Sequence, residues 1–245
     1  MTLETIFILA GVFILASFIQ GLTGFAFGLI SVPLFAVLFS AREAVGMVAI
    51  TGSVLVLYSF FLHRKNVEFR KVVYLGLISI LFLPPGAYFL VSLPERTVML
   101  VLGTVIVLLT IYSALFTEKS KQLMAKKGAG FTAAAVSGLL GGAFTSPGPA
   151  MVVYLYTLDE SRLQAKANVQ FFFAVISIAI LSTHIVSGTV NSVALSRAAP
   201  FLPVVILGTK LGVMLSYRMP VRFFRVLTDI GLIFLGVYII VTSLF

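Results

Sequence analysis

Cysteine and tryptophan are absent from this sequence, and charged residues are scarce. Charged residues make up 10% of the 245 residues and hydrophobic residues 60%, whereas soluble domains carry about 25% charged residues. The absence of cysteine excludes a disulfide framework, thiol chemistry and a cysteine metal site. The shortage of charge leaves too few polar side chains to cover a soluble surface, so lipid must be the solvent of this chain.

Acidic residues are the scarcer charged type, with 8 Asp and Glu against 17 Lys and Arg and a net charge of +9. In a soluble protein this excess would suggest nucleic acid as a partner. Here the basic residues lie in short loops between apolar runs, so membrane topology explains them and nucleic acid is excluded. The start, Met1-Thr2-Leu3-Glu4, lacks the basic region of a signal peptide, so we expect the first apolar run to remain in the mature protein.

Signatures of catalysis and of cofactor binding are also missing. No His/Asp/Glu cluster has the spacing of metal ligands. No Walker-type nucleotide loop occurs, which argues against direct ATP hydrolysis. The sequence therefore predicts neither an enzyme nor a bound cofactor or metal.

Ten apolar segments predict an all-α polytopic membrane protein. They cover residues 5–20, 25–39, 44–62, 72–92, 96–116, 129–141, 149–158, 165–187, 198–217 and 223–245. A bilayer core of about 30 Å needs about 20 helical residues, which the third to fifth and the eighth to tenth segments provide. The first and second segments, like the sixth and seventh, are short and joined through Gly/Pro-rich stretches. Each short pair is either one broken helix that crosses once or a hairpin that returns to its starting side.

Positive charge decides between these arrangements, because Lys and Arg accumulate on the cytoplasmic side. If each short pair is a hairpin, 13 basic residues fall in cytoplasmic loops and 3 outside, with Lys210 inside a segment. If each pair crosses once, the division is 9 inside and 7 outside. The hairpin arrangement is favoured. It puts both termini outside and orients the two halves oppositely, as in the inverted-topology repeats of many secondary transporters.

Matching residues in the two halves support this repeat. At an offset of 117, Gly21, Gly24 and Phe27 match Gly138, Gly141 and Phe144; at an offset of 126, Gly86, Pro94, Arg96 and Tyr112 match Gly212, Pro220, Arg222 and Tyr238. We predict a single transmembrane domain over residues 1–245. Repeat one covers 1–118, a cytoplasmic linker 118–128, and repeat two 129–245.

The two Gly/Pro-rich stretches, residues 20–33 and 138–149, are the candidate functional site. A helix interrupted in lipid is tolerated where its backbone is buried in protein or lines a wet cavity. Pro33, Pro147 and Pro149 are expected to mark new helix starts, whose free N–H groups and positive dipole end favour an anion. The alternative is close helix packing through small residues, which Gly24-x-x-x-Gly28 also fits.

The predicted substrate-binding residues flank these breaks or lie near them in the predicted fold. They are Gln20, Gly21, Thr23, Gly24, Gly28, Gly138, Gly141, Gly142, Thr145, Ser146, Pro147, Gly148, Asn168, Gln170 and Lys210. The amides of Asn168 and Gln170 either donate to an oxyanion or cap a helix entrance. Thr51 and Ser53 are secondary candidates for the lining.

Three ionisable residues fall inside apolar segments. Lys210 and Asp229 each lie about nine residues from the turn at 218–221, about 14 Å deep on adjacent antiparallel helices. They are interpreted as a structural ion pair or as an anion-attracting lysine with its partner. His184, near the outer end of the eighth segment, is interpreted first as hydrogen-bonded structure and second as a proton carrier.

The paired glycine motifs resemble the sulfite exporter TauE/SafE family, also called the toluene-sulfonate uptake permease family. The resemblance rests on Gly21-Leu-Thr-Gly24-Phe-Ala-Phe-Gly28 followed by Pro33, and on Gly138-Leu-Leu-Gly141-Gly142 with Pro147-Gly148-Pro149. It covers essentially the whole chain, including its length and two-half layout. It implies a bacterial inner-membrane carrier of sulfite, sulfonates or similar small sulfur-containing or organic anions, usually an exporter.

Together these observations predict a secondary transporter of a small anion, with export favoured. It would work by alternating access at a midplane site between the two broken hairpins. The alternatives are an anion channel of the same fold and, from another class, an intramembrane enzyme or assembly factor. The expected partners are the anion and the lipid bilayer, while homo-oligomer formation and the coupling ion are left open.

Overall fold

The computed structural model describes residues 3–64, 67–114, 128–158, 161–216 and 221–244, and these residues form helices and no strands. The first half contains α1 (Leu3–Thr23), α2 (Phe27–Ala36), α3 (Ala41–His63), α4 (Phe69–Ser92) and α5 (Glu95–Ala114). The second half contains α7 (Ala129–Phe144), α8 (Gly148–Leu158), α9 (Arg162–Val186), α10 (Ser192–Ala198), the 3-10 turn η1 (Ala199–Phe201), α11 (Leu202–Ser216) and α12 (Val221–Leu244). The predicted all-α class is confirmed. The predicted linker lies outside the described residues, apart from Gly128.

The lengths of the helices differ from prediction at two places. α1 has 21 residues and is long enough to cross a bilayer by itself, although a short segment was expected. The ninth segment begins at Ser192 and is divided into α10, η1 and α11. In the described chain, six stretches are long and apolar enough to span a membrane: Leu3–Thr23, Ala41–Leu62, Phe69–Ser92, Glu95–Tyr112, Gln164–Val186 and Ser192–Ser216. The chain is therefore a multi-pass membrane protein.

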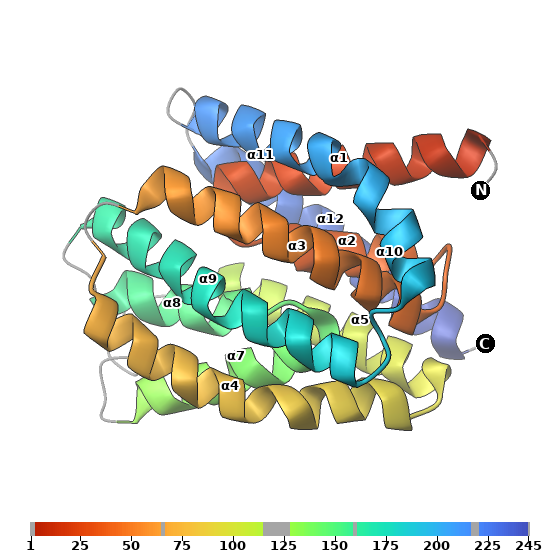
Figure 1. Cartoon of the computed structure of the whole chain (residues 1–245), viewed down its shortest axis with the longest axis horizontal. Helices are drawn as coiled ribbons and strands as arrows, with labels where there is room; N and C mark the ends of the chain where they lie inside the picture. The colour runs from red at the N-terminus through yellow and green to blue at the C-terminus, as the bar shows by residue number, and fades with distance from the viewer. Residues whose placement is uncertain (1–2, 65–66, 115–127, 159–160, 217–220, 245) are drawn as a thin grey trace.

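The helices run between two ends of an elongated bundle. At one end, here the A end, the Ala41 N–H donates to Glu95 Oε1 at 2.7 Å, and Arg197 Nη1 pairs with Glu43 Oε2 at 2.9 Å. At the opposite B end, α4 begins beside α9. α1 begins and α12 ends at the A end, on the right of Figure 1. α3 runs from the A end to the B end, and α9 runs in the reverse direction.

Long helices from opposite halves pair with each other. α1 packs along α11 at one edge of the bundle, and α4 packs along α7 at the other (Figure 1). α3 crosses α9 between them, and α5 packs along α12. Glycines permit the close approaches: a Cβ on Gly212 would strike the Phe18 carbonyl, and one on Gly142 the Leu83 carbonyl. The core therefore joins the two halves of the chain.

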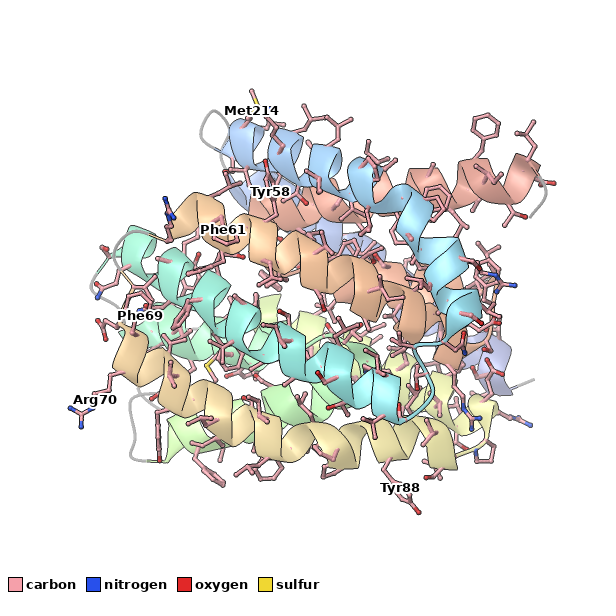
Figure 2. The ribbon with its side chains drawn as sticks, viewed as in Figure 1. Tyr58, Phe61, Phe69, Arg70, Tyr88 and Met214 are labelled. Carbon is pink, nitrogen blue, oxygen red and sulfur yellow. The ribbon has the colours of Figure 1, made fainter. Side chains whose placement is uncertain are left out.

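The outward faces of the bundle are apolar. Phe61 and Tyr88 expose 63% and 71% of their surface, and Tyr88 points away from the bundle in Figure 2. Arg70 and Phe69 project from the start of α4 at the B end (Figure 2). An apolar belt with basic groups beyond it suits a lipid environment.

The helix interruptions are shorter than predicted. The first break is residues 24–26, between α1 and α2, and the second break is residues 145–147, between α7 and α8. Pro33 does not start a helix, because it lies inside α2, which begins six residues earlier. Pro147 directly precedes α8 and Pro149 is its second residue, as expected of prolines at a helix start.

Candidate functional site

The Gln20 side chain bonds main-chain groups on both sides of the first break. The last turn of α1 ends in Gly24, whose φ of 91° is a left-handed conformation that glycine adopts readily. Gln20 Nε2 donates to the Gly24 carbonyl at 2.9 Å, and Gln20 Oε1 accepts the Phe27 N–H at 2.9 Å. One buried side chain thus satisfies groups at both the end of α1 and the start of α2.

Gln170 fixes the same break from the other half of the chain. It lies on α9, is 2% exposed, and its Nε2 donates to the Gly24 carbonyl at 2.9 Å. The Gly24 carbonyl therefore accepts from two buried amides. Gln170 thus bonds the end of α1 rather than the entrance of its own helix, while its Oε1 atom stays buried without a hydrogen-bond partner.

The second break is held by its own backbone. The Thr145 N–H donates to the Gly141 carbonyl at 3.0 Å, and the Ser146 N–H donates to the Leu140 carbonyl at 3.3 Å, which closes the end of α7. Thr145 has a φ of 50°, an unfavourable conformation for a β-branched residue. The Ser146 hydroxyl is buried and has no hydrogen-bond partner. This break therefore keeps a polar group available for a ligand.

The two breaks touch each other through the glycines that open α2 and α8. A Cβ on Gly28 would lie 2.6 Å from the Thr145 carbonyl oxygen, and one on Gly148 would lie 3.2 Å from the Phe25 carbonyl oxygen. Each helix start thus packs against the backbone of the opposite break. A side chain at either glycine would force the breaks apart.

A small cavity of about 50 Å³ lies where the two breaks meet α3 and α9. Its lining is Gln20, Phe25, Phe27, Gly28, Val48, Ala49, Gly52, Ser53, Val56, Thr145, Ser146, Pro147, Gly148, Phe173, Ser177 and Ile180. None of these described residues is ionisable. The first N–H groups of a helix lack intrahelical partners and carry partial positive charge, so the starts of α2 and α8 favour an anion here.

Ser53 and Ser177 join α3 to α9 beside this cavity. Ser53 Oγ donates to the Ala49 carbonyl at 2.7 Å and lies 3.2 Å from the Ser177 carbonyl. Ser177 Oγ donates to the Ala174 carbonyl at 2.9 Å. Thr51 donates to the Met47 carbonyl and does not line the cavity.

A family model described as sulfite exporter TauE/SafE matches residues 9–239. The chain belongs to the sulfite exporter TauE/SafE family. No match is found among curated proteins or among solved structures. Members of the TauE/SafE family are transporters. Membership therefore implies that the chain is a membrane transporter of sulfite or related anions.

The predicted substrate-binding residues of this TauE/SafE protein fall into two groups: residues at the cavity and residues at contacts between helices. Some of the predicted site residues line the cavity: Gln20, Gly28, Thr145, Ser146, Pro147 and Gly148. Gly24 and Gln170 lie directly behind the lining, bound to each other. Gly141 lies against Ile180 and Pro147 at the same place. The Thr23 hydroxyl donates to the Ile19 carbonyl within α1.

Other predicted residues lie at contacts between helices. A Cβ on Gly21 would meet the Thr209 carbonyl of α11, and one on Gly138 would meet the Ser79 carbonyl of α4. Gly142 likewise contacts α4. Asn168 Oδ1 accepts the Glu68 N–H at 2.8 Å at the B end, which joins α9 to the start of α4 rather than capping the entrance of α9. These contacts correspond to the small-residue packing alternative.

Lys210 and Asp229 lie on helices with different partners. Lys210 is on an exposed face of α11, which packs on α1, whereas α12 carries Asp229 and packs mainly on α5. Among the described residues α11 and α12 do not pack along each other, so the expected placement of Lys210 and Asp229 on adjacent helices is not found, and their ion pair stays a prediction. Neither residue lines the cavity.

Sequence reasoning missed the apolar part of the lining. Phe25, Phe27, Val56, Phe173 and Ile180 look like ordinary membrane-helix residues, because the lipid-facing and cavity-facing positions have the same chemistry. The one available signal was their spacing: Phe173, Ser177 and Ile180 fall on one helical face with a serine at its centre.

Proposed function

We propose that this TauE/SafE protein is a secondary transporter, favoured as an exporter, that carries a small oxyanion such as sulfite or a small sulfonate through the cavity between the two breaks. The observation that carries this proposal is the meeting of two helix starts, from α2 and α8, at a small cavity without ionisable lining. The partial positive charge of helix starts favours an anion there, as in transporters built from broken helices.

The cavity supports a compact substrate. A water molecule needs about 10–15 Å³ by this measure, so about 50 Å³ holds a few atoms the size of oxygen. A central atom with three oxygens suits this space. An aromatic sulfonate would require the cavity to open.

An inverted repeat fits the pairing of the elements. The pair of α1 and α11 corresponds to the pair of α7 and α4 in the other half. α3 packs on α9, its own counterpart, and α5 packs on α12, its own counterpart. At an offset of 121, the left-handed residue Gly24 matches Thr145, and the start of α2 matches the start of α8. The lining residues match at 124: Ala49, Ser53 and Val56 with Phe173, Ser177 and Ile180. The offset of 121 at the breaks differs from the predicted 117 by about one helical turn.

Alternating access is the mechanism we infer from this repeat. Equivalent broken helix pairs enter from opposite ends, so rocking one against the other would open the cavity first to one side and then to the other. The basic B end would face the cytoplasm of a bacterial inner membrane, with both termini outside. Export of a monoanion that moves without a compensating ion is favoured by about 2.3 kcal/mol per 100 mV of inside-negative potential.

Purified protein in liposomes tests this proposal against its rivals. Sulfite, methanesulfonate, thiosulfate and acetate would be offered as labelled substrates, and the released compounds identified chemically. We expect saturable uptake of sulfite or methanesulfonate that rises when the liposomes are preloaded with the same anion. Uptake without such trans-stimulation would indicate a channel, and altered products would indicate an enzyme.

Gly28→Ala supplies the site-specific comparison, because its Cβ must displace the Thr145 carbonyl. We expect uptake to fall about tenfold or more, the usual consequence of overpacking. Gly11→Ala is the control, since no atom lies within 4 Å of that Cβ position. Equal uptake by both variants would contradict the placement of the site.

A further inference from the structure

His184 is a fully buried ionisable side chain that the proposed site does not use. It is 0% exposed, and neither ring nitrogen makes a hydrogen bond of good geometry, although the imidazole lies within reach of the Gly141 backbone. Buried polar atoms without partners are uncommon and call for a reason. The main-chain carbonyl of His184 is occupied, since it accepts the Val190 N–H at 2.9 Å. At least one ring nitrogen of the imidazole is therefore left without a partner.

The position of His184 links it to the cavity. Phe173, Ser177 and Ile180 line the cavity from one face of α9, and His184 follows Ile180 by one helical turn on that face. The imidazole lies against the backbone of Gly141, near the end of α7. Ile180 and Pro147 also contact the Gly141 position. His184 therefore touches the helix that leads into the second break.

Burial disfavours a charged imidazole at this position, but the neighbouring helix end offsets part of that cost. The C-terminal end of a helix carries partial negative charge, which stabilises a cation beside it, and α7 ends here. The described elements around this end of α9 offer Arg42 and Glu43 on α3, Tyr88 on α4 and Arg197 on α10, while α7 has no ionisable residue.

None of these groups supplies a free counter-charge. Glu43 is paired with Arg197 at 2.9 Å, the exposed Arg42 donates to the Val91 carbonyl, and Tyr88 faces outward. An anion in the cavity is thus the negative charge available to a protonated His184.

We propose that His184 is a proton-binding site coupled to the cavity, so that the protein carries a proton together with its anion. The anion favours protonation of His184, and by thermodynamic reciprocity the proton favours anion binding. Both would be released together when the cavity opens to the other side. This inference rests on the proposed function, because it assumes that the cavity binds an anion.

Calorimetry of sulfite binding in buffers of different ionisation enthalpy measures the protons taken up per bound anion. Sulfite itself binds protons, so the decisive quantity is the difference between variants at one pH. We expect wild-type protein to take up more protons per sulfite than His184→Gln, by up to about one. His63→Gln removes the other histidine of the chain and should match wild type. Equal uptake by His184→Gln and wild type overturns the inference.

Transport supplies an independent readout. In liposomes with an imposed potassium diffusion potential, the charge moved per sulfite should be more negative in His184→Gln than in wild type, because the variant carries no accompanying proton. Equal charge moved per sulfite by wild type and by His184→Gln would overturn the proton coupling without contradicting the proposed transport function. A wild-type protein that neither binds nor moves sulfite or methanesulfonate overturns the proposed function itself.

Discussion

At the scale of single residues, the site depends on a few polar atoms in an apolar interior. Gln20 satisfies both sides of the first break, whereas the Ser146 hydroxyl in the second break has no protein partner. A satisfied group stabilises the fold, and a buried unsatisfied one costs stability until a ligand pairs with it. The two residues should therefore respond differently to substitution.

Ser146→Ala should weaken anion binding without destabilising the protein. A hydrogen bond to a charged ligand contributes about 1.5–3 kcal/mol, which corresponds to about 10–100-fold in affinity. The thermal midpoint of the ligand-free protein should stay the same or rise, because no protein hydrogen bond is lost. Titration calorimetry with sulfite and thermal unfolding in detergent measure the two quantities. A stability loss with unchanged affinity would assign Ser146 to the fold alone, and Ser182→Ala, on an exposed face of α9, is the control.

Gln20→Leu should destabilise the protein more than Gln170→Leu. The first substitution removes two hydrogen bonds and leaves the Phe27 N–H unpaired, whereas the second leaves the Gly24 carbonyl with its bond from Gln20. An unsatisfied buried group costs about 1–3 kcal/mol and an ordinary hydrogen bond about 1 kcal/mol. Thermal unfolding of both variants measures this order, and the reverse order would contradict the roles assigned to the two amides.

At the scale of helices, the two halves are locked together by glycine contacts between α1 and α11 and between α4 and α7. Gly212→Ala in α11 and Gly86→Ala in α4 would each drive a Cβ into a carbonyl of the facing helix. Both should lower the thermal midpoint, by about 1–3 kcal/mol of stability. Gly231→Ala on α12 is the control, because that position is exposed with no atom within 4 Å. A midpoint unchanged in both test variants would contradict these contacts.

The helices could largely be predicted from sequence, because apolar runs broken by charge determine them. The ends were harder to place. α1 continues through Gly21 to Thr23 because Gly21 packs against α11, a contact that composition does not reveal. Pro33 was expected to start a helix, yet α2 starts at Phe27 because a distant side chain, Gln20, accepts its N–H.

The site could be predicted only in part. Polar residues within apolar sequence, such as Gln20 and Ser146, were recognisable, and both line the cavity. Gly21, Gly138 and Gly142 were grouped with them because glycine serves close packing and broken helices alike. Which role applies depends on the facing helix, and the sequence does not state which helices face each other.

At the scale of the whole molecule, the distribution of basic residues predicts the orientation in the membrane. Ser192→Cys at the A end and Arg64→Cys at the B end place single thiols at exposed positions of a cysteine-free chain. In intact cells an impermeant maleimide should label Ser192→Cys and leave Arg64→Cys unmodified until the membrane is opened. Labelling of Arg64→Cys alone would reverse the predicted orientation.

Access to the cavity tests the central claim most directly. Ser177→Cys places the single thiol of the protein in the lining, where a small anionic thiosulfonate reagent can report its exposure. If the cavity binds the carried anion and opens alternately, the thiol should react in right-side-out and in inverted vesicles. Saturating methanesulfonate, which does not react with the reagent, should slow the reaction about tenfold or more from both sides. Reaction from either side at a rate that methanesulfonate does not change would contradict the account.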